Sequence, residues 1–280
     1  MAIVGVAYVI GASAATITAM GIGYYALGFA LNMIIASVIS KALFSPNQPS
    51  FDGAGAGSSP NLGNRQQIPP ATDNKLAVVY GSAFVGGTII DLSISDDNQD
   101  LYYVMALSEV TGTEAGQTTS TFTFGNIYFG GKLVQFQANG YTVASLLDQS
   151  TGLVDTSVNG LLEFYLYSNG SSSPTNSPFS AVDVMSNPYL VYKWDATKTM
   201  THTVFAIVHI TYNADASLTG IQQTKFQITN NLTNTGAVIY DYLLNTRYGG
   251  AIPAYQIDTT SLNALTAYSN ENFTYTPYTG

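Results

Sequence analysis

The chain has 280 residues, of which 46% are hydrophobic and only 9% are charged, and its formal net charge at pH 7 is −9. This length allows one large domain or two small ones, while the charged fraction lies far below the ~25% of an ordinary soluble domain. Phosphate binding needs clustered Lys and Arg, and the eight basic residues form no cluster, so nucleic acid is excluded as the expected partner. The absence of cysteine excludes disulfides, thiolate metal sites and cysteine nucleophiles.

Tyrosine, threonine, serine and asparagine take the place of charged residues. Tyr and Thr favour strands, whereas Ser, Asn and Gly favour turns, so the composition predicts a mainly β protein of the α+β class. A weakly charged surface rich in Tyr and Asn is typical of permanent protein contacts, because burying charge at an interface costs free energy. The composition therefore indicates a subunit of an assembly.

The first 40 residues contain no charged side chain, and Lys41 is the first. This stretch exceeds the ~20 apolar residues that span a bilayer. A break is expected at residues 21–23, between helices near 3–20 and 24–44.

Small residues recur every fourth position in this segment, at Gly11, Ala15, Ala19 and Gly23. Such a stripe lets helix backbones approach closely. Two interpretations of residues 1–44 stay open: a membrane anchor, or helices packed against copies of themselves in a protein assembly.

The composition changes at residue 45. Residues 45–74 are rich in Pro, Gly, Ser and Asn, which predicts an extended linker. A β-rich region is expected at 75–232, followed by a helix-containing part at 233–280.

Runs of β-favouring residues begin at residue 75. We expect two strands around a turn near Gly81, with Gly86 and Gly87 forming a bend or bulge. Turns at Gly130 and Gly131 and at Asn139-Gly140 separate further strands, which are expected at 100–110, 126–129, 133–137, 160–170, 202–213 and 220–229. The strand at 202–213 has an almost wholly apolar middle, which predicts burial on both faces, and 220–229 is its expected antiparallel neighbour.

Helix signals return after residue 233. The first helix has Asn234 or Thr235 as its N-cap, and its apolar face is expected to comprise Val238, Ile239, Tyr242 and Leu243. The second helix has Thr259 or Thr260 as its N-cap, and its inward side is expected to comprise Leu262, Leu265 and Tyr268.

Between these helices lies the sequence NTRYGG, with one of only two arginines in the chain. Gly249 or Gly250 is expected to supply the left-handed residue that ends the first helix, and Pro253 prevents the helix from resuming. Arg247 lies near the negative end of the helix dipole, which predicts a structural role, with Asp241 as a candidate partner.

No catalytic constellation is found, so we expect no enzyme, no cofactor and no metal site. His202 and His209 are seven residues apart on one predicted strand and so face opposite sides, which excludes chelation of one metal and favours a core or interface role. Residues 95–100 hold three acids but lack the later bidentate Glu of a calcium loop, which predicts a solvated turn. The other acids considered as a catalytic pair are scattered and have no sequence support: Glu109, Glu114 and Glu163.

Two stretches resemble the N-terminal hub region of the central tail hub, or tip attachment, proteins of long-tailed bacteriophages. The first, residues 68–90, has a polar connector, a strand ending in Val-Tyr-Gly and a second strand with a glycine pair. Its matching residues are Val78, Val79, Tyr80, Gly81, Gly86 and Gly87. It is followed by LYYVMALSEV and NIYFGGKLV, which are similar to the next strand and glycine hairpin of that family.

The second stretch, residues 233–265, has the more specific order and spacing. A short helix with Tyr-Asp and Leu leads into Asn-x-Arg-Tyr-Gly, then Ile-Pro, then Ile-Asp at the start of another helix. The matching residues are Tyr240, Asp241, Leu243, Asn245, Arg247, Tyr248, Gly249, Ile252, Pro253, Ile257 and Asp258.

The resemblance implies a trimeric, non-enzymatic hub at the distal end of the tail in the virion, built of small β-barrel-like domains with a short α/β insertion. It closes the tail tube and takes part in host attachment and genome delivery. The implied partners are the distal tail protein, the tape measure protein and other tail tip proteins, and residues 1–44 of three chains form a plug in the tube or contact the host membrane.

One departure from the family and one alternative remain. Family members often continue into further domains, so this chain is expected to be a fragment or a short hub. The alternative is a membrane-anchored bacterial surface or secretion protein, with 1–44 as the anchor and 75–280 as a β-rich binding domain. The residues expected to serve structure or assembly are Gly11, Ala15, Ala19, Gly23, Tyr80, Gly81, Gly86, Gly87, Tyr240, Asp241, Arg247, Tyr248, Gly249 and Pro253.

Overall fold

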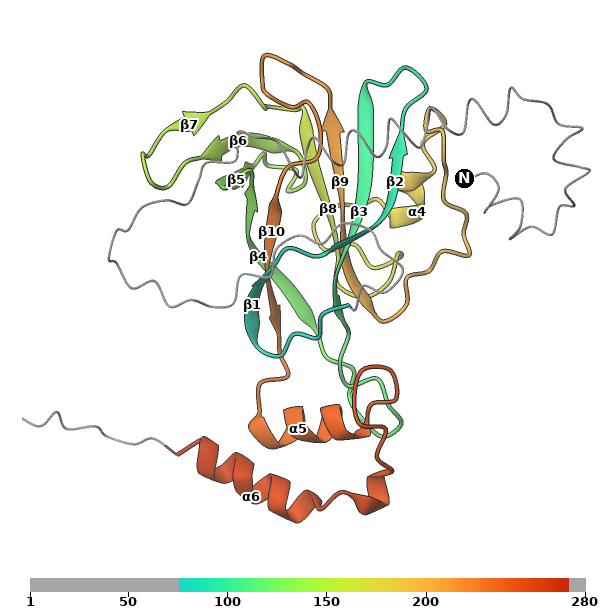
Figure 1. Ribbon diagram of the computed structural model, residues 1–280, viewed down its shortest axis with the longest axis vertical. Coiled ribbons are helices and arrows are strands. Elements are labelled where there is room, and N and C mark those ends of the chain that lie inside the picture. The colour runs from blue at the N-terminus through green and yellow to red at the C-terminus, as the bar shows by residue number, and fades with distance from the viewer. Residues whose placement is uncertain (1–75, 272–280) are drawn as a thin grey trace, which may run out of the picture. The chain divides into compact units, whose positions relative to one another are not determined.

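The structure is a computed structural model that describes residues 76–271. The segment 1–44 with its small-residue stripe and the linker 45–74 lie outside these residues, and the division of the chain into four parts stays a prediction. The strands, labelled in Figure 1, are β1 (Ser82–Val85), β2 (Thr88–Ile94), β3 (Asp100–Glu109), β4 (Phe122–Phe129), β5 (Lys132–Phe136), β6 (Val143–Leu147), β7 (Val154–Asp155), β8 (Leu162–Tyr167), β9 (Thr203–Thr211) and β10 (Thr224–Asn230). The helices are α4 (Ala181–Met185), α5 (Thr235–Leu244), the 3-10 helix η1 (Ala254–Gln256) and α6 (Thr259–Ser269).

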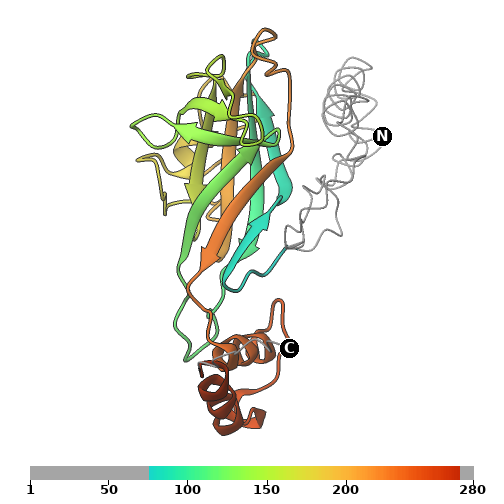
Figure 2. The ribbon, with the colours of Figure 1, turned by 90° about the vertical axis from the view of Figure 1, so that its left-hand side faces the viewer.

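The strands form two antiparallel sheets that pack face to face (Figures 1 and 2). The six-stranded sheet has the order β1-β10-β4-β5-β6-β7, and the four-stranded sheet has the order β2-β3-β9-β8. The prediction of a mainly β fold is confirmed. The resemblance implies small barrel-like domains. Residues 76–230 instead form one sandwich of two sheets.

Aromatic side chains fill the space between the sheets. The ring of Phe164 on β8 lies edge-on to Phe129, Phe136 and Phe226 of the other sheet, with centroid distances of 6.2, 6.1 and 6.0 Å. Each fully buried side chain of this size contributes roughly 1.5–3 kcal/mol through removal from water. The two sheets therefore share one core.

The outer face of the four-stranded sheet is also buried. It lies under α4 and the segment after it, where Trp194 packs near Phe205 of β9. Ser180 caps α4, and its side chain and that of Asp183 each bond the other's backbone N–H. As a result β9 is buried on both faces, as its apolar sequence predicts.

The prediction of two strands joined by a turn near Gly81 is wrong, because the turn between the first two strands lies further along the chain. Gly81 (φ +67°) precedes β1, and the break between β1 and β2 falls at Gly86-Gly87, where the chain passes from one sheet to the other. Gly87 has φ +65°, and a Cβ there would lie 2.7 Å from Leu107 Cδ2. A positive φ and a close neighbour together favour glycine at this crossing.

The predicted pairing of the strand at 202–213 with the strand at 220–229 is also wrong. β9 pairs with β3 and β8, whereas β10 pairs with β1 and β4 in the other sheet. Both edges of β9 are occupied, so β10 has no edge of that strand to join. The glycine hairpin is confirmed, since Gly130 and Gly131 join β4 and β5 with positive φ.

Helices α5 and α6 lie side by side (Figure 1). Asn234 caps α5 as predicted, but α6 is capped by Asp258 rather than by Thr259 or Thr260. The expected inward faces are wrong in part, because Tyr242, Leu265 and Tyr268 are exposed.

The two helices instead meet through Gly236, where a Cβ would lie 2.2 Å from the Leu262 carbonyl oxygen. No helix among residues 76–271 is long and apolar enough to cross a membrane.

Candidate functional site

Asp241 on α5 is fully buried, and its carboxylate accepts three hydrogen bonds. Tyr80 Oη donates to Oδ2 at 2.6 Å, Tyr248 Oη donates to the same oxygen at 2.7 Å, and the Gly112 N–H donates to Oδ1 at 2.8 Å. A buried carboxylate is tolerated only where such donors replace water. Because the donors come from three separate segments, Asp241 joins the helix pair to the sandwich.

The two phenols that bind Asp241 remain protonated. Burial is the main cause that raises the pKa of Tyr80, and the hydrogen bond to Asp241 raises it further. The same two causes, in the same order, raise the pKa of Tyr248. Both hydroxyls therefore act as permanent donors at physiological pH.

Asn245 ends α5 and organises the loop that follows. Its buried side-chain oxygen accepts the N–H groups of Arg247 and Tyr248 at 2.8 and 3.2 Å. Its own N–H donates to the Asp241 carbonyl oxygen at 2.9 Å. These bonds fix the loop after α5 so that the Tyr248 hydroxyl reaches Asp241.

The predicted pairing of Arg247 with Asp241 is wrong. Arg247 Nη2 lies 2.9 Å from both carboxylate oxygens of Glu109 and donates its hydrogen bond to Oε1. Oε2 of Glu109 is buried and receives no directed bond, so only the charge of the guanidinium compensates it. Arg247 thus ties the loop after α5 to the end of β3.

The predicted left-handed glycine at position 249 or 250 is also wrong, since the positive φ falls on Ala251 (φ +50°). Gly249 is required for another reason: a Cβ there would lie 1.9 Å from the Tyr242 carbonyl oxygen. The close approach lets the Gly250 N–H reach the same oxygen at 2.8 Å, while the Ile252 N–H bonds the Leu243 carbonyl at 2.8 Å. The last carbonyls of α5 are therefore satisfied by the loop backbone.

The structure brings together five of the predicted assembly residues: Tyr80, Asp241, Arg247, Tyr248 and Gly249. Others lie around them: the Gly81 carbonyl accepts the Asn230 N–H at 2.8 Å, Tyr240 is half-buried on α5, and Pro253 precedes η1. Gly86 and Gly87 lie apart from this cluster, at the crossing between the sheets.

Sequence reasoning missed several members of the cluster. Glu109 and Gly112 belong to it as described, and Glu114 Oε1 accepts both the N–H and the hydroxyl of Thr246 at 2.8 and 2.7 Å. Asn230 Nδ2 donates to the Val79 carbonyl and to Thr111 Oγ1, both at 2.8 Å. No local pattern marks these residues, because each partner lies more than a hundred positions away along the chain.

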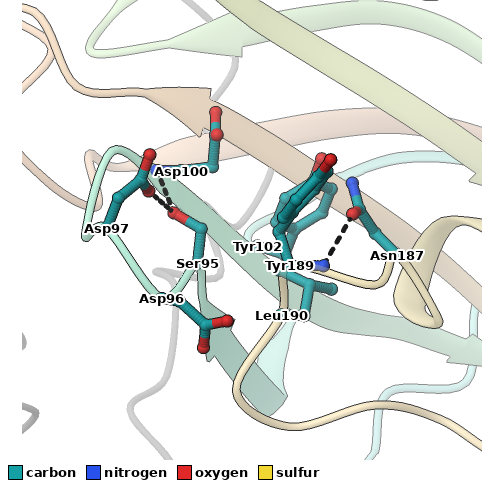
Figure 3. A pocket seen from close by; sticks show the side chains of 8 residues that line it. All are labelled: Ser95, Asp96, Asp97, Asp100, Tyr102, Asn187, Tyr189 and Leu190. Atoms are coloured by element: carbon teal, nitrogen blue, oxygen red, sulfur yellow. Dashed lines mark hydrogen bonds between the residues drawn. The ribbon is translucent and has the colours of Figure 1, made fainter.

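A second region of interest is an acidic pocket of about 240 Å³ beside the turn between β2 and β3 (Figure 3). The turn is confirmed, with the Asn98 N–H bonded to the Ser95 carbonyl at 2.9 Å. Tyr189, one of the lining residues, is 70% exposed to solvent. None of the lining residues is basic. The lining consists of Ser95, Asp96, Asp97, Asp100, Tyr102, Asn187, Tyr189 and Leu190.

His209 lies next to this pocket, between two carboxylates. Nε2 is 2.7 Å from Asp100 Oδ1, Nδ1 is 2.9 Å from Glu163 Oε2, and the ring stacks on Tyr102 with a centroid distance of 4.2 Å. Neither ring nitrogen is free to act as a base or a metal ligand, and residues 76–271 hold no group of His, Asp and Glu suited to a metal ion. His202 lies just before β9 and does not join this cluster.

Comparisons with known proteins give likenesses to solved structures alone. No family model matches the sequence. No curated protein matches it either. Among solved structures, the chain is similar to a chain in the virion of a native gene transfer agent (GTA) particle, with a TM-score of 0.34 and 12% sequence identity.

The match covers 77% of this chain and 39% of the other, so this chain spans well under half the length of that neighbour. A TM-score this low carries no functional conclusion.

Proposed function

We propose that this chain is a structural virion protein, a subunit of the central hub at the tip of a bacteriophage tail. The observation that carries the proposal is the hydrogen bond between Tyr80 and Asp241, which joins the two stretches that resemble the hub family. Tyr80 belongs to the first stretch, and Asp241 and Tyr248 belong to the second. Residues that bind one another are needed together, so the contact explains why both stretches occur in one chain.

The helix pair supports a role in assembly. α6 has 11 residues, packs against α5 through backbone and polar contacts, and buries no side chain, so little apolar surface holds this helix in place. Large apolar side chains are exposed on this part of the chain: Tyr242, Tyr255, Leu265 and Tyr268. Exposed aromatic side chains on a weakly charged protein favour contact with neighbouring subunits.

The proposed hub is a homotrimer without catalytic activity. Its other neighbours are the distal tail protein, the tape measure protein and other tail tip proteins. Residues 1–44 fill the lumen of the tail tube or contact the host membrane during genome delivery. These partners follow from the family resemblance.

The test is to image purified particles decorated with an antibody raised against the folded region 76–271. We expect a single labelled position, at the distal end of the tail, and chemical crosslinking of intact particles should give trimers of this chain. Unlabelled particles, together with recovery of the protein in the bacterial membrane fraction, would overturn the proposal and favour the membrane-anchored surface protein.

A further inference from the structure

His209 links three strands of the four-stranded sheet and one loop of the other sheet. It stands on β9 and binds Asp100, the first residue of β3, and Glu163 on the edge strand β8. Glu163 also accepts a hydrogen bond from Thr142 Oγ1 at 3.1 Å, from the segment between β5 and β6. One imidazole therefore holds together parts that are far apart in the sequence.

With both carboxyl groups ionised, the geometry fits two protons on the ring. A histidine bonded at both nitrogens to carboxylates donates twice only when it is protonated, because the neutral ring has one N–H and one lone pair. In the neutral state one of the two contacts, at 2.7 or 2.9 Å, would bring a lone pair against a carboxylate oxygen. The charged ring satisfies both acceptors, whereas the neutral ring satisfies one.

The groups that face His209 from the surrounding elements are acidic or phenolic. β3 contributes Asp100 and the stacked Tyr102, and β8 contributes Glu163, whose Oε2 also accepts the Tyr165 hydroxyl at 2.6 Å. Asp97 in the neighbouring turn adds a further negative charge near Asp100. Among residues 76–271, no Lys or Arg forms an ion pair with Asp100 or Glu163.

We propose that His209 is a pH-sensitive clamp, which holds the Asp100 carboxylate against β9 when protonated and releases it when neutral, so that the turn at residues 95–100 is then held mainly by its backbone bonds. The Asp100 contact breaks first for two reasons. Glu163 has two other donors and a side chain that is only 20% exposed, while Asp100 has one other donor, Thr211, and is 34% exposed. Because Asp100 lines the acidic pocket, its release also changes that pocket.

The direction of the effect follows from the balance of burial and hydrogen bonding. Burial by itself would lower the pKa of His209, but the bonds to Asp100 and Glu163 outweigh it and raise that pKa above the ordinary value. A raised histidine pKa stabilises the folded chain below the ordinary pKa of histidine, and this stability is lost as the pH rises through the raised value. The clamp is therefore closed in mildly acidic solution and open in alkaline solution.

The first experiment is a ¹⁵N NMR titration of the imidazoles in the full chain, where His202 provides the only other histidine signal. We expect His209 to be doubly protonated at about pH 6.5 and to lose its proton at a higher pH than free histidine does. A His209 ring that is neutral at that pH, or that titrates at the ordinary value, would overturn the proposal. This measurement needs no variant.

The second experiment is amide hydrogen exchange, corrected for the intrinsic effect of pH. Protection of the bonds within residues 95–100 should fall about tenfold between about pH 6 and about pH 9, while the middle of β9 stays protected. Asp100→Asn should remove this pH dependence. Asp96→Asn, in the same turn but without contact to His209, should retain it. Equal protection at both pH values in the unaltered chain would contradict the clamp.

Discussion

The hydroxyl of Tyr80 lies 2.6 Å from Asp241 Oδ2, and this bond joins residues 161 positions apart. Tyr248 donates to the same oxygen, so a single buried carboxylate oxygen fixes both the segment before β1 and the loop after α5. The attachment of the helix pair to the sandwich therefore depends on few polar groups, each of which can be removed separately.

Removal of one phenol tests this attachment. Tyr80→Phe deletes a hydrogen bond to a buried charge and should lower the free energy of unfolding by about 1.5–3 kcal/mol. Tyr242→Phe is the matched control, because Tyr242 lies on the same helix as Asp241 and is 53% exposed. Tyr242→Phe should change the free energy of unfolding by less than about 0.5 kcal/mol. Urea denaturation of both variants measures the difference.

A double-mutant cycle with Asp241→Asn separates the bond from other effects of the substitutions. If Tyr80 and Asp241 interact, the double variant should lose an amount of unfolding free energy that differs from the sum of the two single-variant losses by roughly 0.5–3 kcal/mol. Additive losses would show that the two residues stabilise the chain independently.

Gly249 is the second test, since its role is spatial. A Cβ at Gly249 would lie 1.9 Å from the Tyr242 carbonyl oxygen, so Gly249→Ala should displace the loop and cost about 2–3 kcal/mol. At the adjacent Gly250 the nearest atom would be 3.2 Å away, and Gly250→Ala should cost less than about 1 kcal/mol. Equal losses in thermal unfolding would refute the spatial explanation.

The contrast between these glycines shows how far sequence alone reaches. The sequence correctly predicts that a helix ends before the glycine pair, since α5 ends at Leu244, but it wrongly assigns the stop to the glycines. It does not reveal that Ala251 takes the positive φ, because that depends on how the loop folds back on the helix. Similarly, the acidic pattern of the chain does not reveal that Glu109 rather than Asp241 binds Arg247, since that pairing depends on sheet topology.

The same limit applies to the strands. Alternation and turn residues predict most strands and the Gly130-Gly131 hairpin, because these depend on neighbours in the chain. Sheet membership depends on contacts between distant residues, which is why β10 is in the opposite sheet from β9. The faces of α5 and α6 fail to follow hydrophobic periodicity because the helices meet through Gly236 and Thr266, which carry little apolar surface.

Gly87 is the third test, at the crossing between the sheets. Gly87→Ala combines a positive φ of +65° with a Cβ 2.7 Å from Leu107 Cδ2 and 2.9 Å from the Ala106 carbonyl oxygen. We expect a loss of about 2–4 kcal/mol. Gly116→Ala has a similar φ of +84° but open space around the added carbon, so it should cost only about 1–2 kcal/mol. Chemical denaturation that ranks the two variants in the opposite order would show that contact with Leu107 is unimportant.

Acid should destabilise the chain through the carboxylates around His209. The hydrogen bond from His209 is the main cause that lowers the pKa of Asp100. Burial by itself would raise the pKa of Glu163, but the bonds from His209 and Tyr165 outweigh it and lower that pKa.

A lowered carboxylate pKa contributes stability above the ordinary pKa of the group, and this stability is lost as the pH falls through the lowered value. The melting temperature should therefore fall below about pH 4, and Glu163→Gln should reduce the size of that fall.

The ion pair of Arg247 gives the last prediction. Arg247 is 49% exposed, so the pair is screened by water, and Arg247→Gln should cost only about 1 kcal/mol or less, with a smaller loss in high salt. The Glu109 side chain is 13% exposed, and one of its carboxylate oxygens accepts no hydrogen bond. The guanidinium of Arg247 therefore compensates the negative charge on that oxygen.

Glu109→Gln removes that buried charge, and the double variant should therefore be no less stable than Arg247→Gln alone. Urea denaturation at low and high salt tests both statements. A double variant clearly less stable than Arg247→Gln would mean that the Glu109 carboxylate stabilises the β3 end by itself.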